Sequence, residues 1–154
     1  MRKKICIALA IIWMGVIFYM SNQPASISSI HSGNTINIIS KLPIIGNIMD
    51  YLTSINIGEF IVRKCAHMFS YCILAIFLFM SVYEDNIKKA IIIAFLGTFL
   101  YACSDEFHQL FVLGRSGSFI DVLIDLSGVI FCLFLIFCIN KIVRIFKKDY
   151  SIKL

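Results

Sequence analysis

Four long apolar runs, near residues 5–22, 66–83, 90–112 and 119–140, constrain this chain more than any other feature. A helix that crosses a bilayer needs roughly 20 mainly apolar residues, and each run is close to that length. The 154 residues are 60% hydrophobic and only 15% charged, whereas soluble domains carry about 25% charged residues. The sequence therefore predicts a single all-α integral membrane domain, residues 1–154, with about four transmembrane helices.

The first run and the segment that follows it leave more than one interpretation open. A cleaved signal peptide is the alternative for the first run, because Ala25 and Ser26 are small. We favour a first span, because the apolar part, residues 5–20, exceeds the usual h-region of about 7–15 residues. Residues 22–56 are interrupted by Pro24 and Pro43 and are too polar to span. We expect interfacial helices there, near 36–42 and 44–52.

The basic residues are distributed unevenly between the two ends of the four predicted spans. Four spans place both termini on one side, together with the 84–89 turn. That side carries ten Lys and Arg residues, and the other side carries four. The positive-inside rule then predicts that both termini are cytoplasmic and that residues 22–60 and 104–118 face outward. The net charge of +5 is explained by this topology, so we predict no nucleic-acid partner.

Polar and charged residues gather at the predicted outer ends of the last three spans. Charges at such positions are costly, so each needs a reason. On the second span Arg63, His67 and Tyr71 follow an i, i+4, i+8 spacing, which is one helical face. We expect nine residues to line one cavity: Arg63, His67, Tyr71, Asp105, Glu106, Gln109, Arg115, Asp121 and Asp125. Lys64 is a further candidate ligand residue.

Three chemistries could use such a cavity. Acid–base catalysis would use His67 with the carboxylates of Asp105, Glu106 and Asp121, since burial shifts such groups toward neutrality. Binding of an anion would use two arginines as a phosphate clamp, with Lys64, Tyr71, Gln109 and Asp125 completing the ligand-binding set. The third chemistry is a divalent metal held by His67, Asp105, Glu106 and Asp121. The spacing of these residues is not compact, so we predict neither metal nor cofactor.

The purely structural alternative is that these polar groups hydrogen-bond the helices to one another. In that case Arg63 and Arg115 would neutralise Asp121 and Asp125 as a packing clamp. The alternative is reasonable for any single residue. It is weaker for the whole set, because gluing four helices does not require four carboxylates, two arginines and a histidine.

Two ordered strings carry a family resemblance. Residues 63–74, RKCAHMFSYCIL, contain R-K-x-x-H-x-x-x-Y-x-x-L, and residues 104–128, SDEFHQLFVLGRSGSFIDVLIDLSG, contain D-E-x-x-Q followed by G-R and D-x-x-x-D-x-x-G. Together with FYMSNQP at 18–24, they resemble the VanZ-like family from Phe18 to Gly128. The chain departs from that pattern at Leu113, where many members have proline, and at Asp125, where many have asparagine.

The resemblance implies a bacterial cell membrane and a role near the cell envelope. The family is named for a protein that raises resistance to teicoplanin, so lowered susceptibility to glycopeptides or lipoglycopeptides is the first functional expectation. The implied partner is a membrane lipid or a lipid-linked wall precursor. The resemblance supplies no reaction, so enzymatic activity stays open. The rival is a non-catalytic protein that excludes drug or docks a partner. A transporter is disfavoured, since four spans lack repeated halves.

Overall fold

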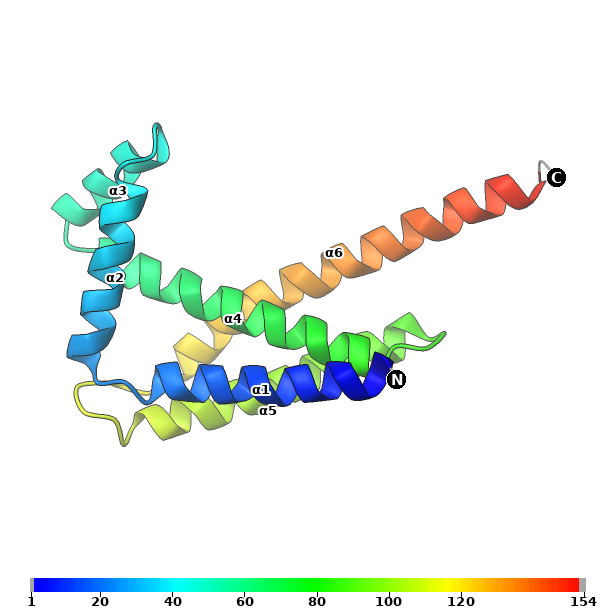
Figure 1. The fold of residues 1–154 in the computed structure, drawn as a ribbon, viewed down its shortest axis with the longest axis horizontal. Helices are drawn as coiled ribbons and strands as arrows, with labels where there is room; N and C mark the ends of the chain where they lie inside the picture. Colours follow the sequence, from blue (N-terminus) through cyan, green and yellow to red (C-terminus); the bar gives the residue numbers. More distant parts are fainter. Residues whose placement is uncertain (1, 153–154) are drawn as a thin grey trace.

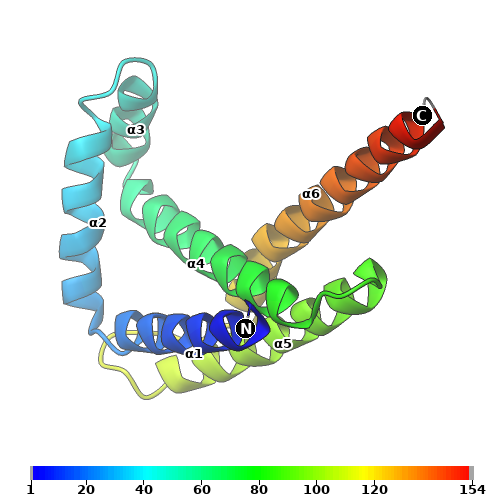
Figure 2. The same ribbon diagram turned by 45° about the vertical axis from the view of Figure 1, so that its right-hand side comes forward.

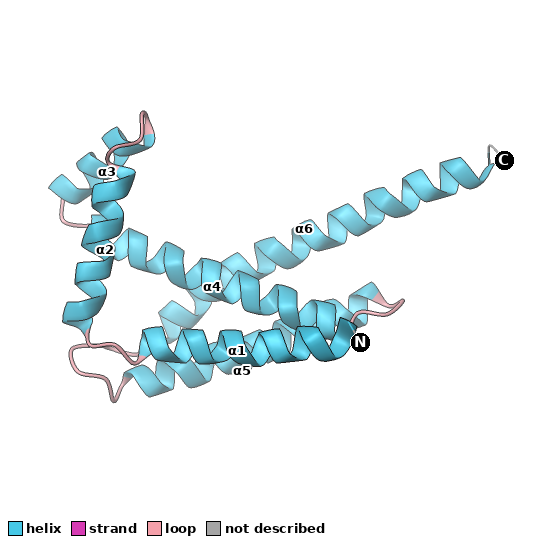
Figure 3. Ribbon diagram, viewed as in Figure 1, coloured by secondary structure: helices cyan, strands magenta, loops and turns pink. Residues whose placement is uncertain are grey.

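The computed structural model describes residues 2–152, with side chains as far as residue 144, and those residues form six helices without a strand (Figures 1 and 3). The all-α prediction is confirmed. The helices are α1 (Arg2–Ser21), α2 (Ala25–Ile39), α3 (Ile45–Ser54), α4 (Gly58–Val82), α5 (Ile87–Gln109) and α6 (Phe119–Ile152).

Four helices are long and apolar enough to cross a membrane: α1, α4, α5 and the part of α6 up to Arg144. The prediction of four spans is therefore confirmed, although the helices differ in extent from the apolar runs. Helix α4 begins at Gly58, where the sequence predicts that the helical pattern opens, whereas its apolar part begins near residue 66. Helix α6 continues past residue 140, since residues 141–152 contain no glycine or proline that would end it. The apolar runs indicate which residues lie in the membrane, but they do not indicate where each helix begins and ends.

Helix α4 is the centre of the bundle and packs against α1, α2, α3, α5 and α6. Its buried face includes Tyr71, Leu74 and Ala75, which pack with small residues such as Ala94 of α5 and with Val129 of α6. The outer surface of the spans remains apolar, with side chains such as Ile11 and Phe131 exposed. Such a surface requires an apolar solvent, which agrees with the four spans.

The N-terminus and the α4–α5 turn lie at one end of the bundle (Figures 1 and 2), and α6 contacts this turn as it leaves the bundle. Lys3 forms an ion pair with Glu84 of the turn. The Asn140 side chain donates to the Tyr83 hydroxyl at 3.0 Å. Arg144 donates to the Asp85 carbonyl at 3.3 Å. The opposite end holds α2, α3 and the 110–118 turn, which is joined to α2 by the Ala25 amide donating to the Leu113 carbonyl at 3.2 Å.

Helix α2 stands crosswise to α1 and packs on α4 (Figures 1 and 2). The expected helix at 36–42 is wrong in its bounds, because α2 begins directly after Pro24 and ends at Ile39. Burial of Ser32 and Ile36, rather than an apolar run, stabilises this helix. The second expected helix, near 44–52, corresponds to α3, whose exposed Ile45, Ile48 and Tyr51 form a stripe typical of an interfacial helix.

Candidate functional site

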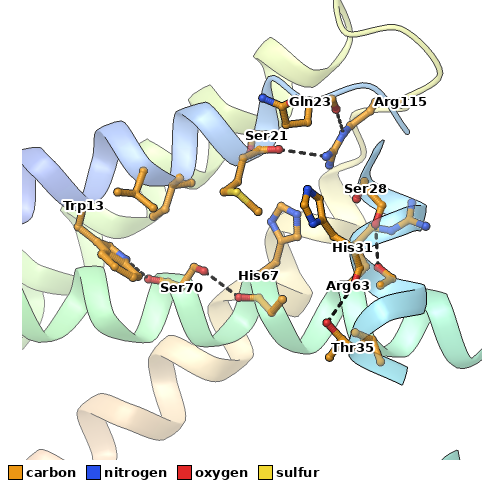
Figure 4. A pocket seen from close by; sticks show the side chains of 16 residues that line it. Trp13, Ser21, Gln23, Ser28, His31, Thr35, Arg63, His67, Ser70 and Arg115 are labelled. Carbon is orange, nitrogen blue, oxygen red and sulfur yellow. Dashed lines mark hydrogen bonds between the residues drawn. The ribbon is translucent and has the colours of Figure 1, made fainter. Parts of the chain in front are cut away.

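A pocket of about 230 Å³ lies in the corner between α1, α2 and α4 (Figure 4). Helix α1 gives it an apolar wall, which includes Trp13 and Ile17. The other walls bring together two arginines and two histidines: Arg63 and His67 of α4, His31 of α2 and Arg115 of the α5–α6 turn. Among the described residues that line the pocket, none is Asp or Glu. The pocket is therefore suited to an anionic ligand.

Arg63 and His67 reach the pocket because they lie one helical turn apart on the inner face of α4. Four residues of α-helix rise about 6 Å, so the guanidinium and the imidazole project into neighbouring levels of the same pocket. The Nε of Arg63 is buried and has no hydrogen-bond partner among the described residues. A buried donor without an acceptor costs free energy, and an acceptor on a ligand would remove that cost.

Arg115 is held differently, by the backbone at the end of α1. Its Nε donates to the Gln23 carbonyl at 2.9 Å, and one terminal nitrogen donates to the Met20 carbonyl at 3.1 Å. The last carbonyls of a helix have no partner within the helix, so Arg115 closes the end of α1. Gly114 permits the preceding turn, because its φ of +74° is a conformation that other residues rarely adopt.

The guanidinium groups of Arg63 and Arg115 both line this pocket. Burial and the Arg63 charge lower the pKa of Arg115 below its usual range, although the Asp105 and Glu106 carboxylates act in the opposite direction. An anion between them would relieve this repulsion. Because part of the Arg115 fork is already engaged with carbonyl groups, Arg63 has the more available fork for a phosphate.

A buried hydrogen-bond network lies beside the pocket and is centred on Asp105, which is 3% exposed. Its Oδ2 accepts hydrogen bonds from Ser21 Oγ at 2.7 Å, from Tyr71 OH at 2.9 Å and from Gln109 Nε2 at 3.2 Å. These contacts join α1, α4 and α5. Ser21 also lines the pocket, so it connects the network to the pocket wall.

The other two predicted catalytic carboxylates make contacts that position α6. Glu106 accepts a hydrogen bond at 3.0 Å from the backbone amide of Ser118, the residue before α6, and thereby satisfies a donor at the start of that helix. Asp121 pairs with Lys64 across the α4–α6 interface, with Nζ and Oδ2 2.6 Å apart. Both carboxylates therefore hold the α5–α6 corner.

The pocket between α1, α2 and α4 brings together only some of the nine residues that were expected to line one cavity. Of the nine, Arg63, His67 and Arg115 line the pocket. The others form the Asp105 network, the contacts of the α5–α6 corner and a buried position at Asp125. Helical phase correctly indicated an inward face, but close packing lets the carboxylates bond directly to neighbouring helices. The catalytic roles predicted for His67, Asp105, Glu106 and Asp121 stay predictions.

Sequence reasoning missed the contributions of α1 and α2 to the pocket. Ser21 lies within the FYMSNQP string and could have been noticed as a polar residue at the end of an apolar run. His31 lies in a segment without apolar periodicity, and no local pattern indicated that α2 would turn it toward α4.

Comparison with protein families matches residues 6–142 of the chain to the family described as VanZ/LLP1. The chain belongs to the VanZ-like family. The matched residues include nearly all of the four spans, together with the pocket and the Asp105 network. The chain is thus a VanZ-like multi-pass membrane protein. Neither a curated protein sequence nor a solved structure matches it.

No cluster of three or more His, Cys, Asp and Glu side chains suited to a metal ion occurs within the searched part of this VanZ-like chain, the described residues. His31 and His67 both line the pocket, but the carboxylates that could complete a ligand set are bonded elsewhere. The arginine and histidine side chains that line the pocket are suited to an anion.

Asp125 departs from the usual asparagine of VanZ-like sequences, and both of its carboxylate oxygens lack a partner among the described residues, although the side chain is 1% exposed. We expect Asp125→Asn to raise the stability of the detergent-solubilised protein by about 1 kcal/mol, because an unpaired buried carboxylate costs more than an amide of the same shape. Thermal unfolding measures this. Asp121→Asn is the matched control and should lower stability, since it breaks the Lys64 ion pair. A lower unfolding temperature for Asp125→Asn would contradict this account of the buried carboxylate.

Proposed function

We propose that this VanZ-like protein binds the anionic head group of a lipid-linked envelope component in the pocket. Binding would lower susceptibility to glycopeptide or lipoglycopeptide antibiotics such as teicoplanin. The observation that carries the proposal is the lining, in which two guanidinium and two imidazole groups converge without a carboxylate. Guanidinium groups bind phosphate oxygens through paired hydrogen bonds, and Arg63 has a buried donor available for one of them.

The geometry favours binding over catalysis. Of the four residues predicted to be catalytic, His67 lines the pocket, whereas Asp105 and Glu106 accept hydrogen bonds from the protein and Asp121 pairs with Lys64. A general base must lie within hydrogen-bond reach of the proton that it removes. We therefore assign these carboxylates to positioning and the pocket to recognition.

The proposed location is the bacterial cytoplasmic membrane, with both termini in the cytoplasm and the pocket at the outer face. The ten-to-four distribution of Lys and Arg supports this orientation. Contacts such as Lys3 with Glu84 and Arg144 with Asp85 gather the strongly basic segments at one end of the bundle. The opposite end, which holds the pocket, would face the lipid-linked components outside the cell.

The orientation predicts the result of cysteine labelling in intact cells. In a cysteine-free background, Asn34→Cys on α2 should react with a membrane-impermeant maleimide, and Lys89→Cys near the α4–α5 turn should react only after the membrane is permeabilised. Both positions are exposed in the structure, so accessibility within the protein does not limit the reaction. Labelling of position 89 in intact cells would reverse the proposed orientation.

Teicoplanin susceptibility of cells that express Arg63→Gln tests the proposed function. The variant removes the guanidinium while retaining a polar side chain. Arg63 makes no ion pair with the residues whose side chains the structure describes, so folding should persist. At matched membrane abundance, its minimum inhibitory concentration should fall to that of cells without the protein. Lys88→Gln, which removes a cation at the other end of the bundle, should retain protection. Full protection by Arg63→Gln would contradict the proposed anion site.

The second candidate is a non-catalytic protein whose polar residues are structural and whose outer surface excludes drug or docks a partner. The Asp105 network favours it, because these carboxylate contacts join helices. The candidate predicts that protection follows abundance alone. Arg63→Gln at normal abundance would then protect as well as the unmodified protein.

A further inference from the structure

We infer that the ligand is a lipid phosphate monoester that enters the pocket sideways from the bilayer, between α1 and α2. This inference rests on the proposed function and names the chemical class of its ligand. Three observations carry it: the two-sided lining of the pocket, the opening between the helices and the number of fixed positive charges.

The lining is apolar on one side and cationic on the other. Helix α1 contributes Trp13, Val16, Ile17 and Met20, which lie opposite the arginines and histidines. From Trp13 to Gln23 the chain advances ten residues, or about 15 Å if helical throughout, so the apolar wall extends well into the membrane. The Trp13 indole donates to the Ser70 carbonyl at 2.9 Å and closes the deeper end. An amphiphile could place its phosphate at the cations and its chain along α1.

The pocket opens on the outer surface of the bundle. Val16 and Met20 line it while remaining 41% and 48% exposed, and His31 on the α2 side is also exposed. The opening therefore lies between α1 and α2, where the apolar surface of α1 meets acyl chains. A volume of about 230 Å³ is below the roughly 300–1,000 Å³ of pockets that enclose drug-sized ligands. The pocket can hold a lipid head group and the first part of its hydrocarbon chain, with the rest of that hydrocarbon chain in the bilayer.

The fixed charge favours a monoester over a diester. Arg63 and Arg115 supply two permanent positive charges, and the lining itself holds no Asp or Glu among the described residues. The Asp105 carboxylate lies behind the wall, where it accepts a hydrogen bond from Ser21. A phosphate monoester carries a charge of about −1.5 to −2 at neutral pH, whereas the diester of an ordinary phospholipid carries one negative charge. The monoester matches the two guanidinium groups more closely.

Fluorescence of Trp13 provides a direct assay, because it is the one tryptophan in the sequence and it lines the pocket. The full chain in detergent micelles would be titrated with phosphatidic acid brominated on its acyl chains, and separately with phosphatidylglycerol brominated in the same way. We expect phosphatidic acid to quench Trp13 with at least about tenfold higher affinity, a difference of about 1.4 kcal/mol. Competition with unlabelled farnesyl phosphate, with farnesol as its uncharged control, distinguishes an isoprenoid source of the monoester from a glycerolipid source.

Arg63→Gln and Lys88→Gln are the matched variants. Loss of the preference for phosphatidic acid in Arg63→Gln, with the preference retained in Lys88→Gln, would support the inference, and unchanged thermal unfolding of both variants would show that they are folded. Equal quenching by the two brominated lipids would overturn the monoester inference while leaving the proposed anionic head-group site intact. Absence of saturable quenching by any anionic lipid, and absence of competition by farnesyl phosphate, would contradict both.

Discussion

Asp105→Ala is expected to be about 2–4 kcal/mol less stable than Asp105→Asn, because it removes an acceptor on which three helices converge. Individual hydrogen bonds between membrane helices contribute roughly 0.6–1.7 kcal/mol. Asp105 accepts two of this kind, from Ser21 and Tyr71, and a third from Gln109 within α5. Two of the donors, Ser21 and Tyr71, are at most 1% exposed, so water cannot replace the lost acceptor. Asparagine keeps one acceptor oxygen in nearly the same place.

Thermal unfolding of both variants in the same detergent measures this difference. The alanine variant should also lose part of the pocket wall, because Ser21 would no longer be held toward Asp105. Equal unfolding temperatures for the alanine and asparagine variants would show that the network contributes little to the bundle.

Gly117→Ala is expected to lower stability by about 3 kcal/mol, at the upper end of typical overpacking costs. A Cβ at this position would lie far inside van der Waals contact with the Glu106 carbonyl oxygen and 3.0 Å from Leu110 Cγ. The oxygen belongs to the backbone of α5, so it cannot rotate away. The turn would have to move, and with it the Ser118 amide that donates to Glu106.

Gly33→Ala is the control for this change. Gly33 lies within α2, and a Cβ there would meet nothing within 4 Å. Alanine in a helix interior is more favourable than glycine by roughly 0.5–1 kcal/mol, so the control should be slightly more stable than the unmodified protein. If the two substitutions shifted the unfolding temperature equally, the close approach of the turn to α5 would be refuted.

The four spans could be predicted from the sequence because their cause is local. A run of apolar residues in a chain with so few charges has no stable place except the bilayer. The ends of the helices do not depend on the apolar runs alone. Arg63 and Lys64 lie beyond the apolar run of α4 yet remain helical, and residues 141–152 continue α6 because nothing there interrupts a helix.

The sequence could predict which residues of the candidate site share one face of a helix, but not what those residues contact. The i, i+4 spacing correctly placed Arg63 and His67 on one face of α4, and both line the pocket. Phase says nothing about which neighbour a side chain meets. The partners of Asp105 come from α1 and α4, and the contacts of Arg115 are backbone carbonyls about 90 residues earlier in the chain. The position of His31 depends on how α2 packs against α4, which no local pattern specifies.

The central claim is that the pocket binds an anionic head group through Arg63, and a crystal structure of the protein purified with its native lipids tests it most directly. The account predicts electron density for a phosphate within hydrogen-bonding distance of Arg63 Nε, with an attached chain passing between α1 and α2. Bound anionic lipid elsewhere on the bundle, for example in the apolar groove of α5 and α6 beside Lys88, together with a pocket that holds no phosphate, would contradict it.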